Sequence, residues 1–411
     1  MKKKSVLELF LSYMVAAGFI FNCNSMWKNA TNTSKFVLPV FAIMIGAMLV
    51  LVMLKSYEEG NRLPKRSILF SFFLIAYGAI YCLVMGQVRN VLPLILTMII
   101  SVFLIDLYDE EGFPKILYCY KTLMIFIAAS SLFFWIFGSI LHVIKANSYV
   151  ISAWDGFASV PNYYGVYFEA HRNAVTFLGN ITQNTSVFTE PPMAAVNFCF
   201  ALLFTFFEKY NPKVKRQRVM LILSIISTVS VLGLIFLAIL YFVKVFDGRG
   251  ARYNFNTVIK YLLSVLFTII LIYAGYFIIS DKLGSASGVV RLDDYKAGYQ
   301  AWKVKPIFGY GLGDDKPIQQ YMSAWRISNM GNSSPIMAIL TEVGIYGLSL
   351  YVYAIVGGIY RAFKTKKTNL IMLMCFICLI IVSCLIEYAY IFLFLLIWVN
   401  RSKSLKQLVD E

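Results

Sequence analysis

Residues 36–54 read FVLPVFAIMIGAMLVLVML, a run of nineteen residues without a charged side chain. Nineteen helical residues extend about 28 Å at 1.5 Å per residue, close to the roughly 30 Å hydrocarbon core of a bilayer. Residues 67–84 and 261–279 form runs of the same kind. Because polar and apolar residues do not alternate in these runs, we predict membrane-spanning helices and not barrel strands.

The composition of the whole chain is typical of a polytopic membrane protein. Of its 411 residues, 59% are hydrophobic and only 14% are charged, too few for the surface of a soluble protein of this length. The formal net charge of +16 comes from lysines and arginines concentrated in short connections between apolar runs. Such residues orient membrane helices. We therefore interpret the positive charge as a determinant of membrane topology and not as a nucleic-acid-binding surface.

The basic connections predict which parts of the chain face the cytoplasm. They lie at 2–4, 55–66, 209–218, 244–260, 361–367 and 401–406. Cytoplasmic placement of all of them requires two crossings within 219–243, so we predict a break at Ser227-Thr228-Val229-Ser230, where polar side chains can pair freed backbone groups. Residues 370–399 are also too many for one span, and they contain the charged Glu387. We therefore predict that they form a closing hairpin of two helices.

This topology predicts an all-α polytopic integral membrane protein with about twelve transmembrane helices and both termini in the cytoplasm. Two long outer loops are expected to carry short amphipathic helices. The predicted parts are N-terminal transmembrane helices at 1–140, a first outer loop at 141–190, central transmembrane helices at 191–280, a second outer loop with the catalytic motif at 281–334, and C-terminal transmembrane helices with a cytoplasmic tail at 335–411.

The second outer loop contains the most specific pattern in the chain. Residues 289–313 read VVRLDDYKAGYQAWKVKPIFGYGLG. Four apolar residues recur at i, i+3, i+7 and i+10, which predicts an amphipathic helix held at the membrane surface. Pro306 is expected to end that helix, and the glycines at 309–313 predict a flexible turn. The residues of the apolar stripe are Leu292, Tyr295, Tyr299 and Trp302.

Arg291 lies at the start of this predicted helix. A guanidinium in that position can bind two oxygens of a diphosphate in a bidentate fork. The alternative is that Arg291 pairs with Asp293, with Asp294 or with lipid head groups. The sequence favours neither reading of Arg291 over the other.

No pattern in the sequence is typical of a metal or cofactor site. The only histidines, His142 and His171, lack the spacing of metal ligands, and no dinucleotide or phosphate-binding loop motif occurs. The acidic pairs at 293–294 and 314–315 have lysines beside them, which favours solvated carboxylates over a divalent-ion site. We therefore expect neither a metal nor a cofactor.

Glu190 ends the first outer loop immediately before Pro191-Pro192 and an apolar run. Because proline suits the first helical turn, Glu190 is predicted to lie at the N-terminus of a helix. There a carboxylate interacts favourably with the helix dipole, which is one role for it. At the edge of a dry cavity it also suits a general base, which is the other.

Four segments together resemble the repeat-unit polymerases of O-antigen and capsule assembly, often called Wzy-type. Three of them are NTSVFTEPPMAA at 184–195, STVSVLG at 227–233 and NSSPIMAILTEVGIYG at 332–347. The fourth is the 289–313 block. The resemblance covers roughly the C-terminal half of the chain, and the N-terminal half is similar only in its hydrophobic spans.

The resemblance implies a metal-independent glycosyltransferase that elongates a glycan on polyprenyl (undecaprenyl) diphosphate, in lipopolysaccharide or capsule biosynthesis. It implies a multi-pass protein of the bacterial cytoplasmic (inner) membrane with its active site facing outward. Its partners would be lipid-linked glycans, membrane lipids, and possible chain-length regulator and flippase proteins, without nucleic acid. Arg291 and Glu190 would be catalytic. The expected substrate-binding residues are Arg172, His171, Asp293, Tyr295, Trp302, Lys303 and Asn332.

Two other activities stay open at this stage. O-antigen ligases share the fold and the loop arginine but tend to have His-Asn where this chain has Gly331-Asn332, which favours a polymerase. A flippase or transporter of lipid-linked sugars would line a midplane cavity with charges, whereas this chain concentrates its polar motifs in two loops. A metal-dependent transferase with acidic residues in its first short outer connection is disfavoured, because 24–35 contains none.

Overall fold

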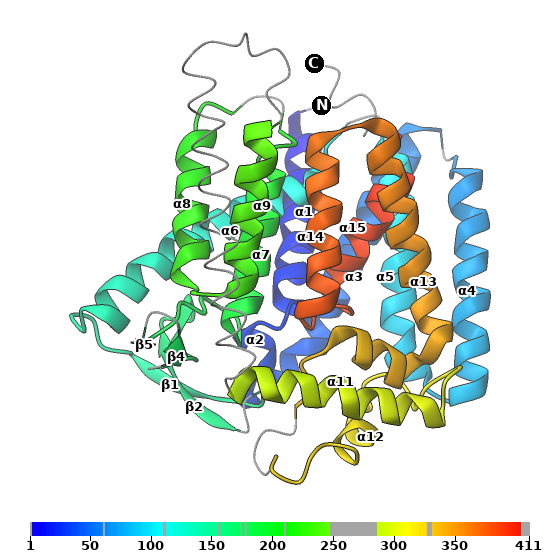
Figure 1. Cartoon of the computed structure of the whole chain (residues 1–411). Helices are drawn as coiled ribbons and strands as arrows, with labels where there is room; N and C mark the ends of the chain where they lie inside the picture. The colour runs from blue at the N-terminus through cyan, green and yellow to red at the C-terminus, as the bar shows by residue number, and fades with distance from the viewer. Residues whose placement is uncertain are drawn as a thin grey trace.

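The computed structural model describes residues 2–60, 62–109, 112–154, 157–172, 174–176, 179–208, 211–246, 286–326 and 331–403. Figure 1 shows an array of long helices with strands and short helices gathered at one end. Among the described helices, six are long and apolar enough to cross a membrane, and four shorter apolar helices accompany them. The predicted multi-pass helical class agrees with these elements. The number of about twelve crossings stays a prediction, and the predicted span at 261–279 lies outside the described residues.

The helices of the array have these bounds: α1 (Lys2–Asn22), α3 (Val37–Glu58), α4 (Lys65–Met85), α5 (Val88–Leu107), α6 (Lys115–Phe134), α7 (Pro191–Phe204), α8 (Val214–Ser227), α9 (Val231–Phe246), α13 (Pro335–Thr365), α14 (Thr368–Ser383) and α15 (Tyr390–Arg401). Helix α7 is the centre of the core, since every residue from Met193 to Phe204 is buried. A helix that is apolar on all faces is stable only when other helices surround it. Helices α6, α8, α9 and α14 pack around it.

The break predicted within 219–243 is confirmed, because α8 ends at Ser227 and α9 begins at Val231. The first outer loop supplies partners for the groups that this break leaves open. Asn184 donates its backbone N–H to the Ser227 carbonyl at 3.1 Å and its Nδ2 to the Ser227 hydroxyl at 2.9 Å. Gln183 Nε2 donates to the Val229 carbonyl at 3.3 Å. The run at 370–399 is likewise divided, with 384–389 between α14 and α15.

The first outer loop contains strands and not the short amphipathic helices that were predicted for it. A three-stranded antiparallel sheet has the order β1-β2-β3 and a second sheet pairs β4 with β5. In the register, Val150 faces Val160 and Tyr163 faces Tyr167. β-Branched and aromatic residues favour such pairing. The strands are β1 (Ser148–Ser152), β2 (Ala158–Tyr163), β3 (Tyr167–Phe168), β4 (Ala174–Thr176) and β5 (Gly179–Ile181).

The second outer loop forms the predicted amphipathic helix, α11 (Ala286–Val304), followed by the short α12 (Lys316–Gln319). Leu292 and Tyr299 of the predicted apolar stripe are 49% and 44% exposed, so the stripe does not pack against the helix array, and its place at the membrane surface stays a prediction. Small residues form the packed face instead. A Cβ on Gly298 would lie only 2.5 Å from the Met337 Cβ, so this glycine lets α11 approach α13 closely.

The glycine-rich turn at 309–313 is held by backbone hydrogen bonds, so the prediction of a flexible turn was wrong. Helix α13 is interrupted at Gly344, whose φ of 64° and ψ of −166° are not helical. The interruption frees backbone groups on both sides. Tyr310 N donates to Thr341 O at 2.8 Å, and Tyr346 N donates to Ile307 O at 2.9 Å. The turn and the interrupted helix therefore satisfy each other's backbone N–H and carbonyl groups.

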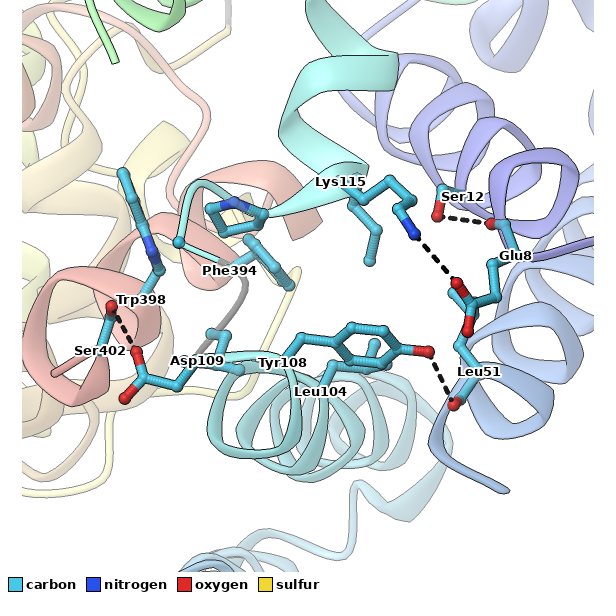
Figure 2. A pocket seen from close by; sticks show the side chains of 14 residues that line it. Glu8, Ser12, Leu51, Leu104, Tyr108, Asp109, Lys115, Phe394, Trp398 and Ser402 are labelled. Carbon is cyan, nitrogen blue, oxygen red and sulfur yellow. Dashed lines mark hydrogen bonds and ion pairs between the residues drawn. The ribbon is translucent and has the colours of Figure 1, made fainter. Parts of the chain in front are cut away.

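The opposite end of the array contains those parts of the basic connections that the structure describes. There Lys115 Nζ donates to Glu8 Oε2 at 2.9 Å, beside a small cavity (Figure 2). Arg401 pairs with Asp106, and Ser402 Oγ donates to Asp109 Oδ1 at 2.7 Å. The acidic connection after α5 thus lies at the same end as the basic ones. The strands, α11 and α12 lie at the other end (Figure 1), so the two polar loops share one side of the array, as predicted.

Candidate functional site

Three segments that are distant in the sequence are tied together at Asn24, at the loop end of the array. The Asn24 side chain donates to the Leu385 carbonyl at 2.8 Å, in the turn between α14 and α15. Its backbone carbonyl accepts from Thr189 N at 3.1 Å. Met26, which begins the short helix α2 (Met26–Asn29), donates its N–H to Val187 O at 2.7 Å. These bonds hold the end of the first outer loop against the ends of α1 and α14.

Charged side chains from three elements surround this junction. Glu190, Glu387 and Arg291 lie close enough to Cys384 for their charges to act on its buried thiol. That thiol is 3.4 Å from the Met193 sulfur, one turn into α7. The two residues predicted to be catalytic, Arg291 and Glu190, therefore lie in one region although about one hundred residues separate them.

Glu190 is the N-cap residue of α7, and two prolines follow it in the first turn, as predicted. Its side chain makes no capping hydrogen bond to the helix. Its Oε1 accepts a hydrogen bond from Trp154 Nε1 at 2.8 Å. The carboxylate is half-buried, and no described residue donates to its other oxygen. It can therefore accept a further donor, such as a sugar hydroxyl.

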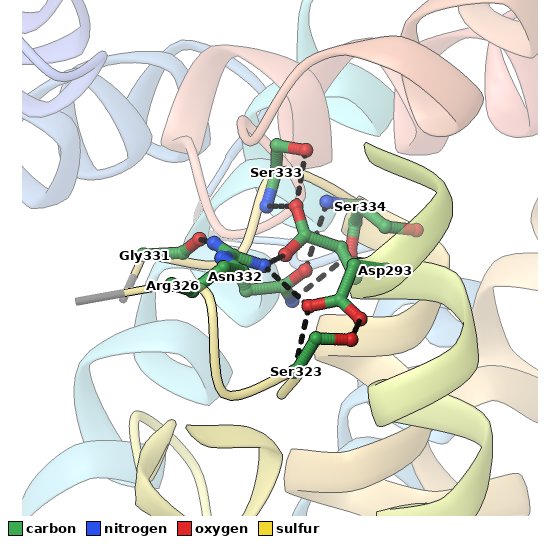
Figure 3. Close-up of polar contacts among 8 residues, drawn as sticks. Asp293, Ser323, Arg326, Gly331, Asn332, Ser333 and Ser334 are labelled. Atoms are coloured by element: carbon green, nitrogen blue, oxygen red, sulfur yellow. Dashed lines mark hydrogen bonds and ion pairs between the residues drawn. The ribbon is translucent and has the colours of Figure 1, made fainter. Parts of the chain in front are cut away.

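Arg291 does not pair with the acidic residues beside it, so that part of the alternative was wrong, while pairing with lipid head groups stays a prediction. Asp293 and Asp294 bind Arg326, which is fully buried (Figure 3). The Arg326 Nη2 also donates to the Gly331 carbonyl at 2.8 Å. Arg291 itself is exposed and has no hydrogen bond or ion pair with any described residue. Its guanidinium is available to a ligand.

The acidic pair connects α11 to two later parts of the loop. Asp293 accepts from Ser323 N at 3.1 Å and from its hydroxyl, and Asp294 accepts from Ser333 N at 2.8 Å. Burial alone would raise the pKa of Asp293, but hydrogen bonds from Ser323 and Arg326 outweigh it and hold the pKa below its usual value. We call Asp293, Asp294 and Arg326 the loop clamp. In the described part of the chain, no cluster of three or more acidic, His or Cys side chains is placed to hold a metal.

Some of the predicted substrate-binding residues lie near Arg291 and some do not. Tyr295, one turn away, donates its hydroxyl to the Val382 carbonyl at 3.2 Å. Asn332 forms a local turn in which its Oδ1 accepts from Ser334 N at 3.0 Å. Trp302 and Lys303 lie on the same helix at least eleven residues from Arg291, about 16 Å along its axis. Those two residues cannot share a small ligand with Arg291.

The first-loop residues predicted to bind substrate make their described contacts within that loop. Arg172 Nε binds Glu169 Oε1 at 2.7 Å, and the arginine side chain is half exposed. The His171 carbonyl accepts from Gln183 N at 3.1 Å. No described contact joins either residue to Arg291. Their roles as diphosphate or sugar ligands stay predictions.

Lys28 lies in α2, whose first residue Met26 binds Val187 O, and the sequence did not single it out. Its side chain is half-buried and makes no ion pair or hydrogen bond with any residue that the structure describes. Burial lowers the pKa of its ammonium group, and the neighbouring Cys23 thiol acts in the opposite direction. The one available signal was the lack of acidic residues across 24–35, which leaves this lysine without a local partner.

Searches against protein-family models and curated proteins give no match for this chain. Its own residues are therefore the basis for its function.

Proposed function

We propose that this protein is a polysaccharide polymerase that joins polyprenyl-diphosphate-linked oligosaccharide repeat units at the outer face of the bacterial cytoplasmic membrane. The observation that carries the proposal is the unpaired guanidinium of Arg291 at the loop end of the array, in the same region as the Glu190 carboxylate. A cation without a partner suits an anionic ligand, and a nearby carboxylate suits proton transfer. A polyprenyl-diphosphate glycan requires both.

In the proposed reaction, Arg291 binds the diphosphate of the donor and Glu190 accepts a proton from a sugar hydroxyl of the acceptor. The hydroxyl oxygen forms a bond to the anomeric carbon of the donor glycan. The bond from that carbon to the diphosphate oxygen breaks, and the diphosphate leaves with the electron pair. Arg291 stabilises the leaving charge, an effect worth about 10²- to 10³-fold, and a positioned base contributes about 10²- to 10⁴-fold.

A lateral groove in the helix array supports the proposal that the substrate is linked to a lipid. Nearly all of its surface is apolar. Helices α4, α5, α13 and α15 contribute its walls, and Leu312 of the glycine-rich turn reaches it. Because α4, α5 and α13 are long enough to span a bilayer, a hydrocarbon chain is the natural occupant of such a groove.

Arg291→Ala is expected to abolish polymer formation, and Arg291→Lys to reduce it strongly, since lysine cannot form the two-pronged contact. The measurement is polysaccharide banding on a gel, from cells that lack the gene and express each variant at equal membrane abundance. Lys296→Ala is the matched control, because Lys296 is an exposed cation on the same helix.

The banding pattern distinguishes the competing activities. Single repeats on their carrier at the outer face, with a ladder restored by wild type only, would support polymerisation. A normal ladder from Arg291→Ala would contradict the role of Arg291. Long glycan accumulating on the carrier would indicate a ligase, and repeats trapped at the cytoplasmic face would indicate a flippase.

Glu190→Gln is expected to lower the polymerisation rate by about 10²-fold or more, because the amide cannot accept the proton. The amide keeps an oxygen that accepts from Trp154, so the protein should fold as before. Trp154→Phe removes that donor while keeping an aromatic ring, and should lower the rate about tenfold, in line with a hydrogen bond to a charged group. Polymerisation by purified protein with lipid-linked repeat units measures both rates. A full rate from Glu190→Gln would leave Glu190 with a structural role alone.

A further inference from the structure

The three-stranded sheet of the first outer loop lies at the loop end of the apolar span Lys115–Ile140, which contains α6 (Figure 1). A Cβ on Gly138 would be only 2.7 Å from Cε1 of Tyr163 in β2, so the two residues are in direct contact. The Tyr163 ring is also 5.8 Å from the Phe134 ring, centroid to centroid. The hydroxyls of Ser139 and of Tyr167 in β3 are 2.8 Å apart. The sheet therefore packs against the last turns of this span.

The same turns of the span expose apolar side chains, as a helix end in contact with lipid does. The exposed residues are Phe133, Ile136, Phe137 and Ile140. The chain then turns back on the span, because Val143 N donates to the Phe137 carbonyl at 2.8 Å. Val143 is itself exposed. The exposed apolar surface of the span thus continues into the first outer loop.

One face of the sheet extends this apolar surface. In the register, Tyr149 is opposite Pro161 and Ile151 is opposite Ser159. Because side chains two residues apart share a face, Tyr149 and Ile151 lie on the same face as Tyr163, which touches the span. Tyr149 is 64% exposed and Ile151 is 47% exposed. We call the face with Tyr149, Ile151 and Tyr163 the span-side face.

The opposite face of the sheet is apolar too, and the protein itself covers it. Val160 is buried in the main hydrophobic core, and Val150 packs against that core. A sheet with one face on the core normally has a polar face toward water, and an edge strand normally carries charges. β1 is an edge strand, yet Lys145 and Asp155 are the only lysine, arginine or acidic residues from 141 to 168. The span-side face therefore lacks the polar character of a face in water.

We propose that the span-side face rests on the bilayer at the loop end of the array, with Tyr149 and Ile151 among the lipid headgroups and upper acyl chains. Its continuity with the exposed end of the span favours lipid as the occupant, and tyrosine is enriched at membrane–water interfaces. The inference does not depend on the proposed polymerase function. It has a consequence for the candidate site, because Trp154, two residues after β1, donates to Glu190. The lipid surface would fix the height of Trp154 and Glu190 above the bilayer.

The test places the fluorescent amino acid Anap at position 149 of the full-length protein, in nanodiscs of phosphatidylethanolamine and phosphatidylglycerol. Half of the discs also contain a phosphatidylcholine with a doxyl quencher close to its headgroup. Interfacial elements bury their apolar face about 5–10 Å into the boundary between headgroups and acyl chains, so the doxyl lipid should quench this probe strongly. The reference probe replaces Gln320, an exposed residue beside α12, and should emit as in water without quenching.

A charge on the span-side face tests whether that face makes the contact. Ile151→Glu should remove most of the quenching at position 149, because a carboxylate disfavours burial among lipids. Ser148→Glu is the matched control, since Ser148 is exposed on the opposite face of β1. A carboxylate there can still accept from Asn162 Nδ2, which donates to the Ser148 hydroxyl at 2.9 Å. Quenching in Ser148→Glu should equal that of the parent protein.

Each other outcome overturns the inference. Water-like emission at position 149 would mean that the face is solvated. Blue-shifted emission without doxyl quenching, lost in discs that hold one copy of the protein, would mean that a second copy covers it. Equal quenching at 149 and 320, or equal loss in Ile151→Glu and Ser148→Glu, would show no preference for this face. If the protein with the probe at 149 does not fold, the probe at the exposed position 151 carries the same expectation and the same contradicting results.

Discussion

Arg326→Met will disorder the second outer loop and abolish activity, although Arg326 takes no part in the proposed chemistry. The guanidinium is fully buried and pairs with Asp293 and Asp294, of which the second is also fully buried. Removing one partner of a buried ion pair typically costs about 3–5 kcal/mol, because the remaining charge stays buried without compensation. In Arg326→Met, the carboxylates of Asp293 and Asp294 would both remain buried without their cation. Limited proteolysis of the purified protein should show cleavage in 313–334 that wild type resists.

A compensating variant tests whether charge is the cause. In the triple variant Asp293→Asn, Asp294→Asn, Arg326→Met, no buried charge is left unpaired, so part of the stability should return. Arg89→Met serves as the control, since Arg89 is an exposed arginine on α5. Protease resistance of Arg326→Met equal to wild type would show that the loop clamp does not hold the loop. Protease sensitivity of the triple variant equal to Arg326→Met would show that charge compensation is not its basis.

The second large effect is expected at Gly344, where α13 is interrupted. Its φ of 64° and ψ of −166° belong to a region that only glycine occupies readily. A Cβ there would lie 2.1 Å from the Ile307 carbonyl oxygen, which belongs to backbone and cannot move aside. Gly344→Ala should therefore destabilise the protein by about 2–6 kcal/mol, the sum of backbone strain and overpacking.

The melting temperature and the folded yield in detergent measure this effect. Gly46→Ala is the matched control, because Gly46 lies within helix α3 and a Cβ there meets no atom within 4 Å. Alanine in a helix is favoured over glycine by about 1 kcal/mol, so the control should be neutral or more stable. If Gly344→Ala has the same melting temperature as the control, the turn at 309–313 does not depend on the interruption of α13.

Local rules were sufficient for the elements whose causes are local. The apolar run at 36–54 became α3, and Ser227 ended α8 where polar residues interrupt an apolar run. Glu190 occupies the N-cap position of α7 because the two prolines after it suit a first helical turn. The spacing of apolar residues after Arg291 predicted α11. Each of these depends on residues within a few positions of one another.

Predictions failed where the packing partner lies far along the chain. The sequence did not reveal which face of α11 packs, because that face is determined by Met337 of α13, which leaves room only for Gly298. The glycines at 309–313 predicted flexibility, yet the freed backbone groups of α13 bind them. The strands of the first outer loop likewise depend on pairing across turns, which periodicity over a few residues did not reveal.

The sequence by itself determined the membrane class, a few helix ends such as those at Ser227 and Pro191, and the residue types that suit a diphosphate and a proton. Hydrophobic length, helical period and proline chemistry act locally, so they can be read from neighbouring residues. Only the tertiary structure decided which charges are paired. Arg326 forms ion pairs with Asp293 and Asp294, and this leaves the guanidinium of Arg291 open to a ligand. No local rule predicts such distances between residues far apart in the sequence.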